Sequence, residues 1–141
     1  MTYYLSLGSN LGEREQTIRH ALQLIEEQIG VVACCSSYYY SAPWGYESEH
    51  GYCNVCCRLE TVMEPLEVLH ATQAIERQLG RTHKTMNRNY TDRVIDIDLI
   101  QAYDDRHEEI RRNDDELTLP HPLWEEREFV VVPLKEIQTN E

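Results

Sequence analysis

The sequence predicts an α+β fold, an antiparallel sheet with two amphipathic helices on one face. Segments rich in β-forming residues and helical segments follow one another in the order β-α-β-β-α-β. Each helical segment carries one apolar stripe, and glycine or proline lies at most of the boundaries. This order is that of the split βαβ, or ferredoxin-like, arrangement, and we expect additional C-terminal elements to follow it.

The first half of the chain predicts a strand, a helix and a second strand. Residues 3–7 form a short strand that ends at a glycine-containing turn, and residues 13–29 form a helix. Residues 31–40 are rich in β-formers and predict a strand, and residues 41–51 predict a long loop. The apolar stripe of the helix consists of Ile18, Ala21, Leu22, Ile25 and Ile29.

The second half repeats the pattern of strand, helix and strand. Residues 52–62 predict a strand, and Pro65 suits the first turn of a helix that ends near Leu79. A polar loop over residues 81–92 then leads to a strand over residues 94–102. The rest is expected to be irregular, with a short strand near residues 109–111 and helical turns after Pro122 and Pro133.

Length and charge limit the class of protein. The chain has 141 residues, and we expect residues 1–141 to form a single domain. No apolar run approaches the ~20 residues of a membrane span, and the N-terminus lacks a signal-peptide pattern, so we expect a cytoplasmic protein. A net charge of −12 argues against a nucleic-acid-binding protein, which needs a broad basic surface.

The chain has five cysteines, and an odd number without a secretory signal indicates reduced thiols. Cys53 and Cys56 have the spacing of half a zinc site, but no second pair follows them. On a strand, Cys53, Val55, Cys57 and Leu59 would share one face. Buried small side chains are therefore the favoured interpretation, and zinc binding is the alternative.

Asp96 and Asp98 are the most informative residues for function. They lie in a segment that otherwise predicts a buried strand, and alternation places both carboxylates on the same face. Two close carboxylates repel each other, and a divalent cation with oxygen ligands relieves that repulsion. The alternative is a pair of strand-end aspartates that face water, although the apolar neighbours argue against an exposed loop.

A basic segment precedes the aspartates. Residues 77–93 hold five basic residues against one acid, in a strongly acidic chain. A carboxylate pair for Mg²⁺ beside a cluster of cations suits a polyphosphate. Regular alternation would place Arg93 on the opposite face from Asp96, so Arg93 acts with the pair only if the strand begins after it.

Two other places are candidates for ligand contacts. The loop over residues 41–46 leads to Tyr52 and Asn54, and an aromatic ring with an amide can hold a flat heterocycle. These residue types are also common in cores and turns. His121 lies between two prolines near Arg127, which makes it a candidate for phosphate contact, with a purely structural histidine as the alternative.

Taken in order, these motifs resemble the 6-hydroxymethyl-7,8-dihydropterin pyrophosphokinase family of folate synthesis. Each motif is weakly specific alone, but their order and spacing are highly specific, and they cover nearly the whole chain. The family fold is ferredoxin-like, in agreement with the element order above. The motifs are LSLGSNLG at 5–12, SAPWG at 41–45, YCN at 52–54, IERQLGR at 75–81, RVIDIDLI at 93–100, LPHP at 119–122, Phe129 and PLKEI at 133–137.

The resemblance implies transfer of a pyrophosphoryl group from ATP to the hydroxymethyl group of 6-hydroxymethyl-7,8-dihydropterin, with release of AMP. It implies that Asp96 and Asp98 bind two Mg²⁺ ions and act in catalysis with Arg81 and Arg93. The pterin would be bound by Ser41, Ala42, Pro43, Trp44, Tyr52, Asn54 and Phe129. ATP would be contacted by Gln73, Glu76, Arg81, His83, Lys84, Tyr90, Arg93, Leu99, Thr118, His121 and Arg127.

The chain also departs from the family pattern. His83 stands where some members have a second arginine, Glu128 is larger than the small residue often found before Phe129, and the C-terminal tail is short. We expect a monomer that acts on ATP and the pterin without nucleic acid or membrane. The alternatives are a catalytically impaired relative that binds pterin or nucleotide, and a ferredoxin-like RNA-binding module, against which the single Phe and the negative charge argue.

Overall fold

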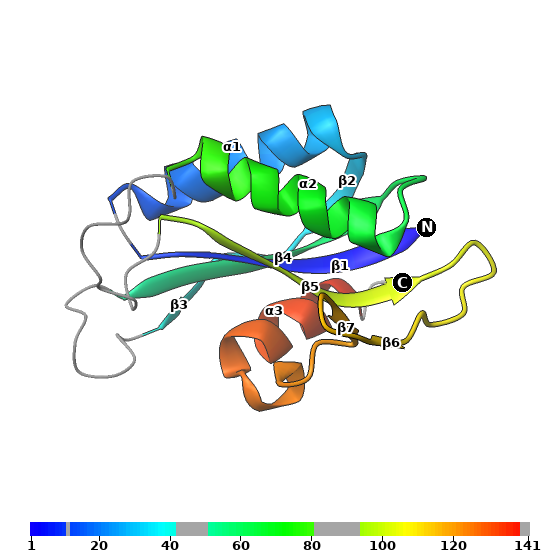
Figure 1. The fold of residues 1–141 in the computed structure, drawn as a ribbon. Helices are drawn as coiled ribbons and strands as arrows, with labels where there is room; N and C mark the ends of the chain where they lie inside the picture. The colour runs from blue at the N-terminus through cyan, green and yellow to red at the C-terminus, as the bar shows by residue number, and fades with distance from the viewer. Residues whose placement is uncertain (11, 42–50, 81–93, 139–141) are drawn as a thin grey trace.

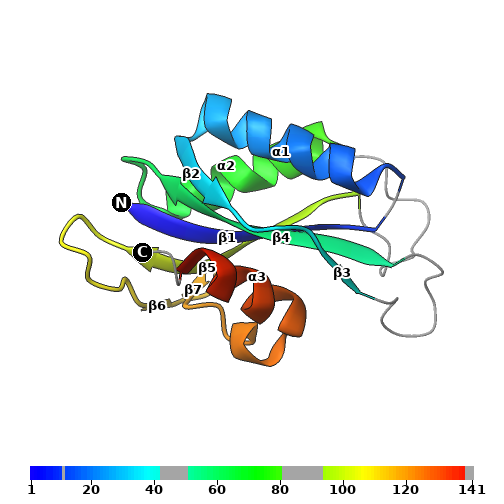
Figure 2. The same ribbon diagram turned by 180° about the vertical axis from the view of Figure 1, so that it is seen from behind.

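In the computed structural model, residues 1–10, 12–41, 51–80 and 94–138 are described, and they form an α+β fold (Figure 1). Helices α1 (Arg14–Gln28) and α2 (Pro65–Gln78) cover one face of an antiparallel sheet (Figures 1 and 2). The predicted α+β class is therefore confirmed, and both predicted helices lie close to their expected bounds. No helix in the described ranges is both long enough and apolar enough to cross a membrane.

The sheet has the strand order β2–β4–β1–β5, and β3 also pairs with β4. Strand β1 is central, and its antiparallel register with β4 and β5 brings the ends of three strands together. The strands are β1 (Thr2–Ser9), β2 (Val31–Cys35), β3 (Tyr39–Ser41), β4 (Tyr52–Glu60) and β5 (Asp96–Tyr103), with a separate pair β6 (Arg112–Asn113) and β7 (Thr118–Leu119).

The strand predicted over residues 31–40 is divided into β2 and β3. Between them the backbone N–H of Ser36 donates to the Cys56 carbonyl at 2.8 Å, and the Ser36 hydroxyl accepts from the Cys56 N–H at 3.0 Å. A side chain thus replaces a backbone carbonyl in the ladder, which is how serine competes with regular strand pairing. The two short strands still follow one edge of β4.

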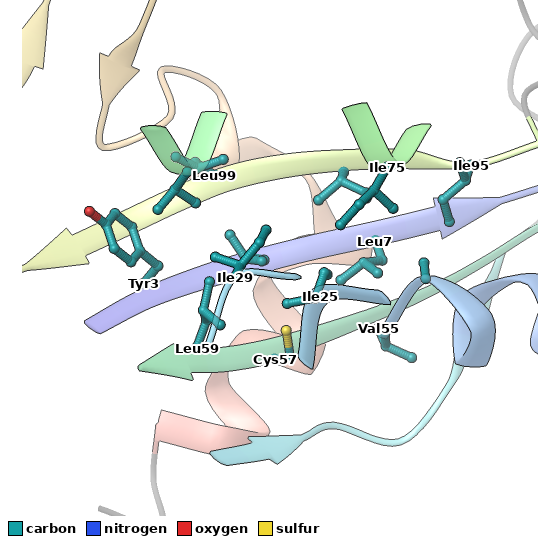
Figure 3. Close-up of a cluster of buried hydrophobic side chains, with 14 of the residues drawn as sticks. Tyr3, Leu7, Ile25, Ile29, Val55, Cys57, Leu59, Ile75, Ile95 and Leu99 are labelled. Carbon is teal, nitrogen blue, oxygen red and sulfur yellow. The ribbon is translucent and has the colours of Figure 1, made fainter. Parts of the chain in front are cut away.

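The larger core lies between the sheet and helices α1 and α2 (Figure 3). It includes Cys53, Val55, Cys57 and Leu59 of β4, all of them at most 2 % exposed. The shared face predicted for these residues is therefore confirmed, and the cysteines act there as small apolar side chains. Within the described ranges no three His, Cys, Asp or Glu side chains are grouped to hold a metal ion.

Helix α3 (Glu128–Gln138) lies on the other face of the sheet (Figures 1 and 2). The sequence predicts only a helical turn after Pro133, and this prediction is wrong, because the helix continues through Pro133. Proline costs one helical hydrogen bond, but Val130, Leu134 and Ile137 are buried against Tyr4, Cys56 and Ile100. The expected helices on a single face are therefore supplemented by a third that covers part of the opposite face.

The short strand predicted near residues 109–111 is displaced along the chain. Glu109 forms an isolated bridge with Tyr103, and the strand itself is β6, which pairs with β7. A 3-10 helix, η2 (Trp124–Glu126), follows Pro122 as expected and leads into α3. This segment places one wall of the site described next.

Candidate active site

Asp96 and Asp98 lie at the start of β5, on the face of the sheet opposite helices α1 and α2. Their neighbour Ile97 packs into the core beneath those helices, while both aspartates are partly exposed. In the register with β1, Asp96 lies opposite Gly8 and Asp98 lies opposite Ser6. The alternation of the strand therefore brings the two carboxylates to one side, as predicted from the sequence.

These residues form the floor of a pocket of about 570 Å³. The floor comes from β1, β4 and β5, and one side from β3 and the start of β4. The opposite wall comes from residues 126–129, where η2 leads into α3. The predicted site residues that line the pocket are Ser41, Tyr52, Asn54, Asp96, Asp98, Arg127 and Phe129.

Asn54 offers a hydrogen-bond acceptor to this pocket. Its side chain is only 4 % exposed, and in the described part of the chain no donor reaches its Oδ1 atom. An acceptor left unpaired in a buried position is costly, so such an atom in a pocket indicates a ligand that donates to it. The amide lies directly over Gly8, where a β-carbon would come 2.4 Å from Asn54 Nδ2.

The wall of the pocket combines an aromatic ring with charged groups. The guanidinium carbon of Arg127 lies 5.9 Å from the centre of the Phe129 ring. Burial, a hydrogen bond to Glu128 and its negative charge all raise the pKa of Tyr39, which lies across the pocket. The Glu128 side chain therefore links the wall to β3.

His121 lies beside this site as a neutral imidazole. Burial lowers its pKa, the charge of Arg127 lowers it further, and the charge of Asp96 acts in the opposite direction. Nδ1 accepts a hydrogen bond from the Leu123 N–H at 3.2 Å, so the proton of the neutral ring is carried by Nε2. The neutral ring of His121 can therefore donate a hydrogen bond from Nε2 but does not act as a cation.

Glu76 and Gln73 occupy different environments, although they lie three residues apart on helix α2. Glu76 is buried, and its Oε2 accepts a hydrogen bond from the Ile97 N–H at 2.7 Å, whereas Gln73 is exposed. Leu99 packs into the core on the helix-covered side, and Thr118 lies in β7. Neither of these two residues is among those lining the pocket.

Several predicted site residues lie outside the described ranges. They are Ala42, Pro43, Trp44, Arg81, His83, Lys84, Tyr90 and Arg93. Of the four residues predicted to act in catalysis, the structure therefore places Asp96 and Asp98.

Sequence reasoning missed several residues that the structure adds to this region, among them Glu126 and Glu128 of the wall. Ser6 lines the floor. Alternation along the strand places it on the same face as Gly8, and this pattern could have been used to predict its position from the sequence. Tyr39 alternates with Ser41 along β3 and lines the same side. Arg14, at the start of α1, contacts the end of the loop that precedes β4, and no local pattern indicates this contact.

A second pocket, of about 510 Å³, lies at the other end of β1. Its lining includes Thr2, Tyr4, Arg58 and Glu60, and none of the predicted site residues that fall within the described ranges. The Arg58 and Glu60 side chains form an ion pair across 3.3 Å. The pocket with Asp96 and Asp98 is therefore the candidate active site.

Comparison with known proteins identifies the family. Residues 4–139 match the family model of 7,8-dihydro-6-hydroxymethylpterin-pyrophosphokinase (HPPK). Three similar proteins bear the name 2-amino-4-hydroxy-6-hydroxymethyldihydropteridine pyrophosphokinase. The protein of Porphyromonas gingivalis is 41% identical over 136 residues, which are 95% of this chain and 88% of that protein.

Two further similar proteins come from Bacillus subtilis and Aquifex aeolicus. The Bacillus subtilis protein is 37% identical over 135 residues, covering 95% of this chain and 76% of its own length. The Aquifex aeolicus protein is 36% identical over 139 residues, which are 99% of this chain and 81% of that protein. The match spans the pocket described above and confirms the resemblance read from the motifs. The chain belongs to the 7,8-dihydro-6-hydroxymethylpterin-pyrophosphokinase family.

Proposed function

We propose that this chain transfers a pyrophosphoryl group from ATP to the hydroxymethyl group of 6-hydroxymethyl-7,8-dihydropterin, releasing AMP. The observation that carries the proposal is one pocket that contains a carboxylate pair, a buried amide with an unpaired acceptor, and an aromatic wall. The family match and the names of the relatives support this reaction. The strand order also supports a ferredoxin-like fold in a single domain.

Asp96 and Asp98 are the proposed ligands of two Mg²⁺ ions. The donor set fits, because Mg²⁺ prefers oxygen and is held by one or two carboxylates together with substrate phosphates and water. Both aspartates are partly exposed in an open pocket, which leaves room for a triphosphate beside them. When bound, the ions supply charge neutralisation for the phosphates and orientation of the reacting groups.

The pterin is proposed to lie against Tyr52 and Phe129, with its polar edge toward Asn54. A flat heterocycle stacks well on aromatic rings, and its N–H groups satisfy the buried Oδ1 of Asn54. Gly8 allows this arrangement because any side chain there would displace the Asn54 amide. The hydroxymethyl group is then oriented toward the aspartates on the same floor.

In the proposed reaction, the pterin hydroxyl oxygen attacks the β-phosphorus of ATP. The bond between the β-phosphorus and the α–β bridging oxygen breaks, and AMP leaves. Asp96 is proposed to accept the hydroxyl proton. The neutral His121 is proposed to donate a hydrogen bond from Nε2–H to the phosphates. Arg127, Arg81 and Arg93 are proposed to place positive charge near them.

The products test the proposal directly. We expect the wild-type protein to convert ATP and the pterin into equal amounts of AMP and a diphosphorylated pterin, as followed by ³¹P NMR and mass spectrometry. Chelation of Mg²⁺ should stop the reaction. Formation of ADP, or binding of both ligands without AMP, would overturn the proposal and support a different transfer or a binding-only relative.

A further inference from the structure

Arg14, the first residue of α1, contacts Gly51, which lies directly before β4. The guanidinium Nη1 of Arg14 donates a hydrogen bond to the Gly51 carbonyl at 2.8 Å. The same guanidinium lies 5.6 Å from the centre of the Tyr40 ring, at the end of β3. Arg14 therefore contacts both chain segments that flank residues 42–50.

The next residue of α1 strengthens the contact to β3. The Tyr40 hydroxyl donates to Glu15 Oε2 at 2.6 Å. This hydrogen bond is the main reason that the pKa of Tyr40 is raised to about 12, and it also lowers the pKa of Glu15. The hydroxyl thus remains a donor, and the carboxylate an acceptor, throughout the neutral pH range.

The two segments lie very close together where Arg14 contacts them. Ser41 of β3 is the antiparallel partner of Tyr52 of β4. A β-carbon on Gly51 would come 2.7 Å from the Ser41 carbonyl oxygen, so the backbones approach at a distance that only glycine permits. Ser41 and Tyr52 both line the candidate active site.

We propose that Arg14 is a positioning residue for the pterin, which it serves by fixing the Tyr40–Ser41 and Gly51–Tyr52 segments against α1. This inference rests on the proposed function. Arg14 combines a charged hydrogen bond to one segment with a cation–π contact to the other, which a shorter or uncharged side chain cannot reproduce. Its effect should fall on pterin binding, because the aspartates on β5 are held by other contacts.

The test compares Arg14→Met with Arg19→Met. Arg19 is a matched control because it lies on the same helix and contacts Tyr38, at 3.3 Å, but does not reach the two segments. We expect Arg14→Met to raise the Kd of the pterin about ten-fold, measured by calorimetry with saturating α,β-methylene-ATP, since a charged hydrogen bond is lost. The Kd of the ATP analogue should stay within about two-fold for both variants.

A second variant keeps the inference testable if Arg14→Met does not fold. Tyr40→Phe removes the hydrogen bond to Glu15 but keeps the ring beneath Arg14, so we expect an intermediate loss of pterin affinity. Equal pterin affinities for Arg14→Met and Arg19→Met, or equal losses for pterin and ATP analogue, would overturn the inference. Failure of the wild type to form AMP would instead count against the proposed function.

Discussion

The Oε2 atom of Glu76 accepts a hydrogen bond from the Ile97 N–H at 2.7 Å, and Ile97 is the residue between the two aspartates. Glu76 is 6 % exposed, so its carboxyl group is almost fully removed from water. A buried carboxylate is tolerated only when it is well hydrogen-bonded. The contact therefore fixes the start of β5 to α2 and, with it, the position of Asp96 and Asp98 on the floor of the pocket.

This relationship predicts the effects of two substitutions at position 76. Glu76→Gln keeps an acceptor at this position, whereas Glu76→Ala leaves the buried Ile97 N–H without this partner. We expect losses of unfolding free energy of about 1 kcal/mol and about 3 kcal/mol, measured by urea denaturation. Gln78→Ala, which removes an exposed contact with Gln28, is the control and should change little. Equal stability for Glu76→Ala and the control would show that the hydrogen bond to the Ile97 N–H does not stabilise the start of β5.

A second prediction concerns the close approach of Gly8 and Asn54. Gly8→Ala places a methyl group against the Asn54 amide, which should destabilise the fold by roughly 1–3 kcal/mol and weaken pterin binding. In an Asn54→Ala background the same substitution should cost much less stability, because the clash is gone. A double-mutant cycle of urea denaturation measures this coupling, and additive effects would show that the two residues do not interact in this way.

The cysteines should differ strongly in reactivity. Burial raises the pKa of Cys53, raises that of Cys56 to about 12 and raises that of Cys57 well above the ordinary value, so few thiolates form. Cys35 is exposed, although its pKa is also raised by partial burial.

We therefore expect iodoacetamide to modify Cys35 in the native protein, faster as the pH rises because thiolate forms, and to spare the three cysteines of β4. Peptide mass spectrometry before and after unfolding in urea gives the pattern. Rapid native labelling of Cys57 would show that the core beneath α1 is open.

Much of the fold follows from local patterns. The apolar stripes predict α1 and α2, and alternation predicts that Asp96 and Asp98 share a face, because both features depend only on neighbours along the chain. The break after β2 depends on one hydroxyl that bonds across the sheet, and the course of α3 through Pro133 depends on burial against β1, β4 and β5. Such tertiary contacts are not visible in a local sequence pattern.

The candidate site, too, can be predicted from the sequence only where local patterns determine it. The aspartates and the aromatic residues can be read from the motifs, but the position of Asn54 over Gly8 requires the register between β1 and β4. Helical spacing groups Gln73 with Glu76, yet only Glu76 is buried against β5. The contacts of Arg14 with Tyr40 and Gly51 join positions far apart in sequence, so they could be found only in the structure.

The most direct measurement of the central claim is the rate of pterin-dependent AMP release by the wild type, Asp98→Asn and Glu125→Gln. Glu125 is an exposed acid in η2 that does not line the pocket, so it controls for loss of one negative charge. We predict that Asp98→Asn stays folded and loses about 100-fold or more in rate, while Glu125→Gln keeps wild-type activity. A folded Asp98→Asn protein that releases AMP at the wild-type rate would contradict the role of the aspartate pair.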